Sequence, residues 1–517
     1  MKHVVPCTVM PIIFYDLETF GLSPAHDRIA EFAGILTDDS LELLEQPYEL
    51  RCLPPPDYLA QPEASLTTGI TPQMALQTGL AEPDFARKVY HWFTAHSDTL
   101  ILGYNNVSFD DEFIRHLFYR TFMEPYGWHF RNGNRRMDLF TVMPAIFDFH
   151  RETLSWPRTE TGAPDFRLEA LATANDALGG TSHEALADTF ALRNITKLIV
   201  DRAPDVWRSL PTFFDKNTVE RRLDHAFRNG LVVIYSSARF RSENRASSFF
   251  TVLGREPGPA GQWWLLDVSR PAKELLDMEP EDVFSRWFSR ERPEPFRLLQ
   301  RVNPRRFPCV LPVGKLQEKR MEELGLPREL VSRNIDLAEG AGIAGWARRL
   351  VDCFSENKAA DVPVPPDATT SSDPMASPGW SQRDVDGRLY DGFLPDSDRA
   401  QVAGIEDMST PEIAGLVRTA SFTDDRYQLL ARRYIGRYTP GRLSSEERHS
   451  FRLDAASRLD VLRFDEAWNQ AIADMANDPE TSFRSRTKKR KILSDLKDHR
   501  NSVVRRMGLE EKYGTLQ

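Results

Sequence analysis

Two carboxylates that lie two residues apart on an apolar segment constrain this chain most. Residues 14–21 read Phe-Tyr-Asp-Leu-Glu-Thr-Phe-Gly, with an apolar approach and a glycine just past the end. Side chains alternate along a β-strand with a period of two, so Asp16 and Glu18 project from the same face. Two anions this close repel each other, and a fold tolerates them if one is protonated, if cations lie between them, or if both face water.

Length and composition predict a soluble protein of several domains. The chain has 517 residues and a mass of 59.2 kDa, which suggests two to four domains. No apolar run approaches the roughly 18 residues of a membrane span, and the first residues lack a secretory apolar region. The four cysteines are isolated, which argues against a zinc site or a disulfide framework and fits a reducing, cytoplasmic location.

The net charge limits the kinds of ligand surface that this chain can offer. The formal charge is −10 at pH 7. This balance argues against a surface coated in basic charge for nonspecific nucleic-acid binding. Phosphate binding would therefore have to come from a local basic surface or from metal ions.

The first part of the chain predicts an α/β domain with a mixed sheet that ends near residue 201. The opening strand and two further apolar segments, joined by short turns, predict antiparallel neighbours. Thr71 and Pro72 resemble an N-cap followed by proline at the first helical position. The further expected strands are 29–37, 41–52 and 100–104, and the expected helices include 136–149, 166–174 and 181–200.

Residues 202–355 have a different sequence pattern, with short apolar segments. Apolar segments at 231–235, 249–253 and 263–268, separated by polar or Gly/Pro turns, predict a small antiparallel β-unit with helices around it. Basic and aromatic residues interleave at 239–245 between the first two segments. That stretch could track a nucleic-acid strand and stack its bases, or it could be a solvated hairpin loop.

The last part of the chain predicts a polar linker followed by helices. The linker, about 355–387, is rich in Pro, Ser, Asp and Ala. Beyond it, an apolar stripe from Tyr427 to Tyr438 predicts a helix core, with Arg432, Arg433 and Arg437 off the stripe as candidates for phosphate contacts. A basic run at 484–491 could bind nucleic acid or form a solvated helix face.

Acidic residues recur beside apolar elements at Asp16, Glu18, Asp110 and Asp188. Alone, such a pair on a strand is common, but together these residues favour a site for Mg²⁺ or Mn²⁺, which prefer hard oxygen ligands. Such a set can hold two ions about 4 Å apart for phosphodiester cleavage. With Thr181 as N-cap, His183 would lie in the first helical turn, where the helix dipole favours a neutral imidazole that can accept a proton.

Three motifs in this order resemble those of the DEDDh-type 3′→5′ exonucleases, which have a ribonuclease H-like fold. They are Asp16-x-Glu18, Asn106-x-x-Phe109-Asp110 and His183-x-x-x-x-Asp188. Further segments look like the bacterial exodeoxyribonuclease I family in particular, so the likeness spans nearly the whole chain. These segments are 15–21, 68–73, 103–112, 166–169 and Leu389-Tyr390-Asp391-Gly392-Phe393.

The resemblance implies an α/β ribonuclease H-like exonuclease domain with a mixed sheet, a small SH3-like β-domain and an all-α C-terminal domain. The expected ranges are 1–201 for the exonuclease domain, 202–355 for the SH3-like domain, 356–387 for the linker and 388–517 for the helical domain. The implied activity is Mg²⁺-dependent degradation of single-stranded DNA from the 3′ end to 5′-mononucleotides, in DNA repair and recombination. By similarity, Asp16, Glu18, Asp110 and Asp188 would bind two Mg²⁺ ions, for which Mn²⁺ could substitute, and His183 would be the general base.

The resemblance also suggests contacts and partners. Five residues lie in segments that resemble those where the family meets the strand, and cations for phosphates and rings for bases suit that role. They are Arg115, Tyr126, Phe130, Arg136 and Arg167. Single-strand-binding protein is a plausible partner, and a monomer is expected. Asp111, beside Asp110, is expected to be solvated.

Two other functions remain open at this point. A related enzyme could act on RNA or serve in proofreading, because the 2′-hydroxyl is read by local geometry that sequence does not give. A non-catalytic single-strand binder could keep the fold without the activity. The intact carboxylates and His183 argue against the binder, because four anions facing DNA phosphates would weaken binding.

Overall fold

The structure is a computed structural model that describes residues 10–180, 184–258, 261–287, 294–313, 318–339, 343–356, 384–477 and 483–516. The chain divides into two compact units. Unit 1 takes the described residues within 1–136, 178–190 and 374–517, and unit 2 takes those within 137–177 and 191–373. No helix in these described ranges is both long enough and apolar enough to span a membrane.

Unit 1 is built on a six-stranded sheet in the order β4-β3-β2-β1-β5-β6. β1 pairs antiparallel with β2 and parallel with β5, and β2 pairs antiparallel with β3. The predicted mixed sheet is therefore confirmed. Its strands are β1 (Ile12–Thr19), β2 (Ile29–Thr37), β3 (Tyr48–Leu53), β4 (Leu80–Ala81), β5 (Leu100–Gly103) and β6 (Arg135–Asp138).

The helices that precede α8 (Pro204–Ser209) can be compared with the predicted ones by where they begin. Thr71 caps α2 by accepting from the Met74 backbone N–H, with Pro72 at the first helical position, as predicted. The helix expected over 136–149 begins only at Leu139, because the preceding residues form β6. The helices up to α7 are α1 (Pro62–Thr68), α2 (Pro72–Thr78), α3 (Glu82–Thr94), α4 (Asp110–Arg120), α5 (Leu139–Phe149), α6 (Leu168–Ala174) and α7 (Ala185–Arg202).

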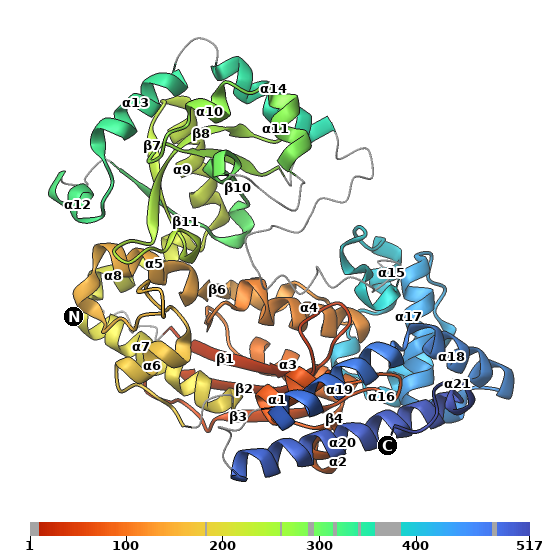
Figure 1. Ribbon diagram of the computed structural model, residues 1–517. Coiled ribbons are helices and arrows are strands. Elements are labelled where there is room, and N and C mark those ends of the chain that lie inside the picture. The colour runs from red at the N-terminus through yellow and green to blue at the C-terminus, as the bar shows by residue number, and fades with distance from the viewer. Residues whose placement is uncertain are drawn as a thin grey trace, which may run out of the picture. The chain divides into compact units, whose positions relative to one another are not determined.

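The C-terminal helices belong to unit 1 and share its cores. Tyr427, Leu430 and Tyr434 of α17 are buried with β1 and α4 residues such as Leu17 and Phe118, so the predicted stripe is core. The long α20 lies alongside α1 and α2 (Figure 1). These helices are α15 (Asp396–Gln401), α16 (Thr410–Thr419), α17 (Asp425–Tyr438), α18 (Ser445–Arg458), α19 (Val461–Asn477), α20 (Phe483–Met507) and α21 (Glu510–Tyr513).

Unit 2 contains a five-stranded antiparallel sheet in the order β10-β9-β8-β7-β11. The three predicted strands correspond to β7 (Val232–Ser236), β8 (Ser247–Arg255) and β9 (Trp263–Asp267). β10 (Leu299–Val302) and β11 (Cys309–Pro312) were not expected, because four residues that include arginine or proline give little alternation. Unit 2 also contains α5, α6 and most of α7. Its later helices are α8 (Pro204–Ser209), α9 (Lys216–Arg228), α10 (Lys273–Leu276), α11 (Pro280–Trp287), α12 (Glu318–Glu323), α13 (Arg328–Glu339) and α14 (Ile343–Glu356).

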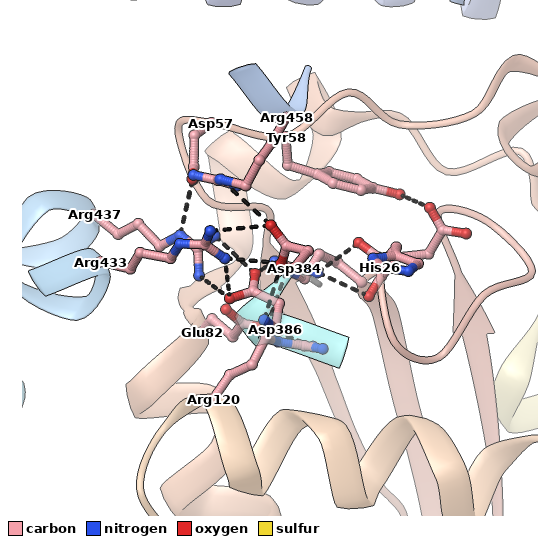
Figure 2. Close-up of polar contacts among 12 residues, drawn as sticks. His26, Asp57, Tyr58, Glu82, Arg120, Asp384, Asp386, Arg433, Arg437 and Arg458 are labelled. Atoms are coloured by element: carbon pink, nitrogen blue, oxygen red, sulfur yellow. Dashed lines mark hydrogen bonds and ion pairs between the residues drawn. The ribbon is translucent and has the colours of Figure 1, made fainter. Parts of the chain in front are cut away.

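A buried network of ion pairs ties the C-terminal helices to the first part of unit 1 (Figure 2). Asp386, in the 3₁₀ helix η10 (Val385–Tyr390), accepts hydrogen bonds from Arg28 at 2.6 Å and Arg437 at 2.8 Å. Arg437 also donates to Asp57 at 2.9 Å. Arg433 reaches Asp386 as well, at 3.0 Å. The network thus joins residues that are more than 300 positions apart in the chain.

These pairings correct the prediction for two arginines. Arg433 and Arg437 are buried in ion pairs rather than free for phosphates. Burial raises the pKa of Asp57, but Arg437 and Arg458 more than offset that effect and hold the pKa well below its usual range. The sequence could not show this because the acidic partners come from distant segments.

Breaking the network should destabilise unit 1. We expect Arg437→Ala to lower the apparent free energy of unfolding by about 3 kcal/mol, because Asp57 and Asp386 both stay buried and each loses one of its arginine partners. Urea denaturation followed by circular dichroism measures this. Arg418→Ala is the control, since Arg418 pairs with Glu447 at an exposed position and should change little. Equal losses in the two variants would contradict the role of the network.

Candidate metal centre and active site

β1 carries the two carboxylates on the face opposite to Ile13, Tyr15 and Leu17. Ile13, Tyr15 and Leu17 are part of the main hydrophobic core of unit 1. Because side chains alternate along a strand, Asp16 and Glu18 project from the other face. Glu18 is only 9% exposed and Asp16 is half-buried, so neither lies in open solvent.

Asp188 joins these two residues from a different element. It lies in the first turn of α7, and one carboxylate oxygen from each of Asp16, Glu18 and Asp188 lies within 4.8 Å of the others. Three such oxygens could share a divalent cation, because Mg²⁺ and Mn²⁺ take carboxylate ligands at about 2 Å. The structure therefore brings together three of the four carboxylates that the sequence predicted.

Burial and mutual repulsion raise the pKa values of the carboxylates in this cluster. Burial, followed by repulsion from Asp188, Glu31 and Asp110, raises the pKa of Glu18 to about 8. Burial also raises the pKa of Asp16 well above its usual range, and the charges of Asp110, Glu18 and Asp188 add to the effect. Carboxylates that cannot all ionise together in the metal-free protein are a suitable donor set for cations.

Asp110, the fourth predicted carboxylate, is the first residue of α4 and is buried. It is not one of the three residues whose oxygens lie within 4.8 Å of one another among the described positions. Its charge nevertheless raises the pKa of both Asp16 and Glu18, so it is electrostatically part of the cluster. It could bind a second ion beside the triad.

His183 and its predicted N-cap Thr181 lie outside the described residues. The described part of α7 begins at Ala185, and Asp188 is in its first turn. The role of His183 therefore stays a prediction.

Asp111 departs from the prediction that it is solvated. It is 0% exposed and accepts hydrogen bonds from Tyr15 Oη at 2.5 Å and from Asn106 Nδ2 at 3.1 Å. Arg136 forms an ion pair with its other oxygen. The prediction was wrong because the buried partners come from β1 and β6, which a reading of the local Phe-Asp-Asp sequence does not reveal.

Three of the predicted strand contacts form one neighbourhood beside α4. Arg115 lies over the ring of Tyr126, with 5.7 Å between the guanidinium carbon and the ring centroid. Phe130 is 55% exposed and packs edge-on against His129, which contacts Arg115. Arg115 itself is only 11% exposed and is paired with Glu112, so the exposed ring of Phe130 is the one of the three side chains that is open to a base.

The other two predicted contacts differ in their surroundings. Arg136 is only 10% exposed and is engaged with Asp111, which leaves its guanidinium little freedom to reach a strand. Arg167, in unit 2, has a 78% exposed side chain that is paired with Asp165 through two nitrogens. Both remain predictions as strand contacts.

Tyr390 is a candidate that the residue-by-residue prediction missed. Its hydroxyl donates to Glu112 at 2.5 Å, and Arg115 pairs with the same carboxylate at 2.6 Å. Tyr390 thus brings the C-terminal region to the Arg115 neighbourhood, while Phe393, three residues on, is 91% exposed. The Leu-Tyr-Asp-Gly-Phe segment, which was part of the family resemblance, carried the signal.

Three family models match the chain. They are described as "Exonuclease" over residues 13–196, "Exonuclease I SH3-like domain" over 215–356 and "Exonuclease I C-terminal domain" over 383–503. The predicted fold class, with an exonuclease domain followed by an SH3-like and a helical domain, is therefore confirmed.

The chain is similar over most of its length to curated and solved proteins. It is 32% identical to exodeoxyribonuclease I of Escherichia coli strain K12, over 84% of this chain and 87% of that protein. For exodeoxyribonuclease I of Haemophilus influenzae the identity is 29%, over 82% and 85%. The crystal structure of E. coli exonuclease I in complex with a dA16 oligonucleotide matches with a TM-score of 0.84 and 28% identity, covering 96% of this chain and 100% of that one. Exonuclease I from Methylocaldum szegediense gives 0.81 and 30%, with the same coverage.

The raised pKa of Glu18 predicts a pH-dependent stability of the metal-free protein. Glu18 has an ordinary pKa of 4.5 when unfolded and about 8 when folded. Between these values the unfolded chain loses a proton that the folded chain keeps, so the folded state loses stability as the pH rises. The Gln side chain of Glu18→Gln does not titrate. Between these pH values we therefore expect the free energy of unfolding of the variant to rise relative to that of wild type by on the order of 5 kcal/mol.

Urea denaturation of both proteins in chelator, from about pH 5 to about pH 9, measures the difference. Titrating groups that do not interact with Glu18 are common to the two proteins and cancel. Asp16 owes part of its raised pKa to Glu18, so its contribution widens the difference in the same direction. Parallel stability curves would contradict the raised pKa.

Proposed function

The chain belongs to the exodeoxyribonuclease I family and is an exonuclease that acts on DNA, and on this premise we propose that it removes nucleotides from the 3′ end of single-stranded DNA. The proposed products are 5′-mononucleotides, and the proposed cofactor is Mg²⁺, with Mn²⁺ able to substitute. The observation that supports this best is the meeting of Asp16, Glu18 and Asp188 within 4.8 Å.

The donor set suits a hard divalent cation. Asp16, Glu18 and Asp188, with Asp110 beside them, offer only carboxylate oxygens, and no described cysteine or histidine is part of the triad. When bound there, two Mg²⁺ ions would supply an activated water and stabilise charge on the departing oxygen. The carboxylates themselves would hold the ions.

His183 is the proposed general base. Its neutral imidazole would accept the proton of the attacking water. His183 precedes Asp188 by five positions and is therefore near the cluster in sequence. This role rests on the family resemblance and on the position of Asp188 at the start of α7.

The strand would be held by cations and rings beside α4. Arg115 is proposed to bind a phosphate, while Tyr126 and Phe130 are proposed to stack against bases. Arg136 and Arg167 are proposed as further contacts. Similar proteins support the substrate class, since E. coli exonuclease I has been solved in complex with dA16 and dT13 oligonucleotides.

The proposed setting is DNA repair and recombination in the cytoplasm, with the protein acting as a monomer. Single-strand-binding protein is the proposed protein partner. The basic, largely exposed stretch of α20 around Lys488 and Arg490 is a surface that an acidic segment could contact.

End-labelled oligonucleotides test the function directly. We expect wild type in Mg²⁺ to shorten single-stranded DNA from its 3′ end with release of 5′-mononucleotides, while a blocked 3′ end protects the strand. Asp16→Ala should abolish release and still bind the strand in chelator, because it removes a cation ligand without touching the residues beside α4.

Matched RNA oligonucleotides separate the related alternatives. Faster degradation of RNA than of DNA would show an exoribonuclease. Strand binding without any release by wild type would show a non-catalytic binder. Either result would overturn the proposal.

His183→Ala tests the general base separately. We expect turnover to fall by about 10²–10⁴-fold, as for other lost general bases, with little change in strand affinity. Single-turnover kinetics at neutral pH measures the chemical step. Turnover near that of wild type would refute the role of His183.

A further inference from the structure

β1 loses one of its two neighbours just before the candidate metal ligands. Its parallel ladder with β5 pairs Ile12 with Leu100 and ends where Phe14 faces Leu102. On the other side, β2 stays paired with β1 through Asp16 and Glu18. The strand segment that carries both carboxylates therefore has backbone support on one edge only.

Beyond the last backbone pair of β1 with β5, side-chain hydrogen bonds connect β1 to its neighbours. Tyr15, the residue after Phe14, donates its hydroxyl to Asp111 Oδ1 at 2.5 Å. Asn106, in the turn that follows β5, donates to the same oxygen at 3.1 Å. Arg136 of β6 pairs with the other oxygen of Asp111. One carboxylate thus connects β1, α4, β6 and the turn after β5.

Stability alone does not explain a buried anion at this place. Tyr15, Asn106 and Asp111 are fully buried, and Arg136 nearly so. A buried ion pair is often no more stabilising than apolar residues of similar volume. The hydrogen bonds to Asp111 do fix the relative positions of the residues that they join, since each hydrogen bond sets both a distance and an angle.

The two bonded residues are the sequence neighbours of two candidate ligands. Tyr15 precedes Asp16 on β1, and Asp111 follows Asp110 at the start of α4. We propose that the Tyr15–Asp111 hydrogen bond is a positioning device that sets the separation of Asp16 from Asp110 and thereby the affinity of the site for its divalent cations. Tyr15 and Asp111 act through the backbone, because neither side chain is itself a candidate ligand.

This inference rests on the proposed metal site and deepens it. Partners outside the ligand shell that orient ligands typically change metal affinity by about 10–100-fold when removed. Tyr15→Phe keeps the ring packed against Phe93 and Trp128 and removes only the hydroxyl. It is therefore a mild test of the hydrogen bond.

The chain offers a matched control in Tyr438→Phe. Tyr438 also donates its hydroxyl to a buried carboxylate, Glu82, which is likewise paired with an arginine, Arg120. Neither Tyr438 nor Glu82 adjoins a candidate ligand in the sequence. The two variants thus lose the same kind of hydrogen bond at different places in unit 1.

The experiment is titration of the full chain with Mn²⁺, without DNA, by isothermal calorimetry, together with thermal unfolding in chelator. We expect Tyr15→Phe to raise the dissociation constant for Mn²⁺ by about 10-fold. Tyr438→Phe should leave it unchanged although both variants lower the melting temperature. In assays with DNA, Tyr15→Phe should need more Mg²⁺ for half-maximal turnover and recover at high concentration.

Three results would overturn the inference. If Tyr15→Phe binds Mn²⁺ as wild type does, the hydrogen bond does not position the site. If Tyr438→Phe weakens Mn²⁺ binding equally, the effect is general loss of stability. If wild type shows no Mn²⁺ binding that Asp16→Ala removes, the proposed metal site fails and this inference fails with it. Asn106→Ala, which removes the second donor to Asp111, should shift the dissociation constant in the same direction and serves if Tyr15→Phe does not fold.

Discussion

Electrostatic repulsion among the carboxylates around β1 is the constraint that the rest of unit 1 must accommodate. Asp16, Glu18 and Asp188 come from a strand and a helix and meet within 4.8 Å in a half-buried place. Side chains of like charge do not gather in this way spontaneously, so surrounding packing must hold them there. The buried core on the opposite face of β1 supplies that support through Ile13, Tyr15 and Leu17.

Unit 1 contains two buried groups of carboxylates, one surrounded by positively charged side chains and the other by further carboxylates. Asp57, Glu82 and Asp386 are surrounded by arginines, which hold each pKa below its ordinary value despite burial. For Asp16 and Glu18, burial and neighbouring carboxylates raise the pKa instead. The first group is neutralised within the protein and serves to join the C-terminal helices to the sheet. The second group would be neutralised by the divalent cations of the proposed function.

The sequence predicted what depends on local pattern. Alternation along 14–21 placed Asp16 and Glu18 on one face, and the Thr71-Pro72 pair located the start of α2. It could not predict pairings between distant segments. Arg437 binds Asp57, 380 residues away, and Asp111 binds Tyr15, 96 residues away, so neither burial follows from the neighbouring residues. The short strands β6, β10 and β11 were missed because their four residues carry too little periodicity.

The central claim is that the carboxylates around β1 form a site for divalent cations. Anomalous diffraction from crystals grown with Mn²⁺ tests this most directly. We expect two anomalous peaks, about 4 Å apart, between the carboxylates of Asp16, Glu18, Asp110 and Asp188. Crystals in which Mn²⁺ occupies other acidic surfaces but leaves this cluster without anomalous density would contradict it.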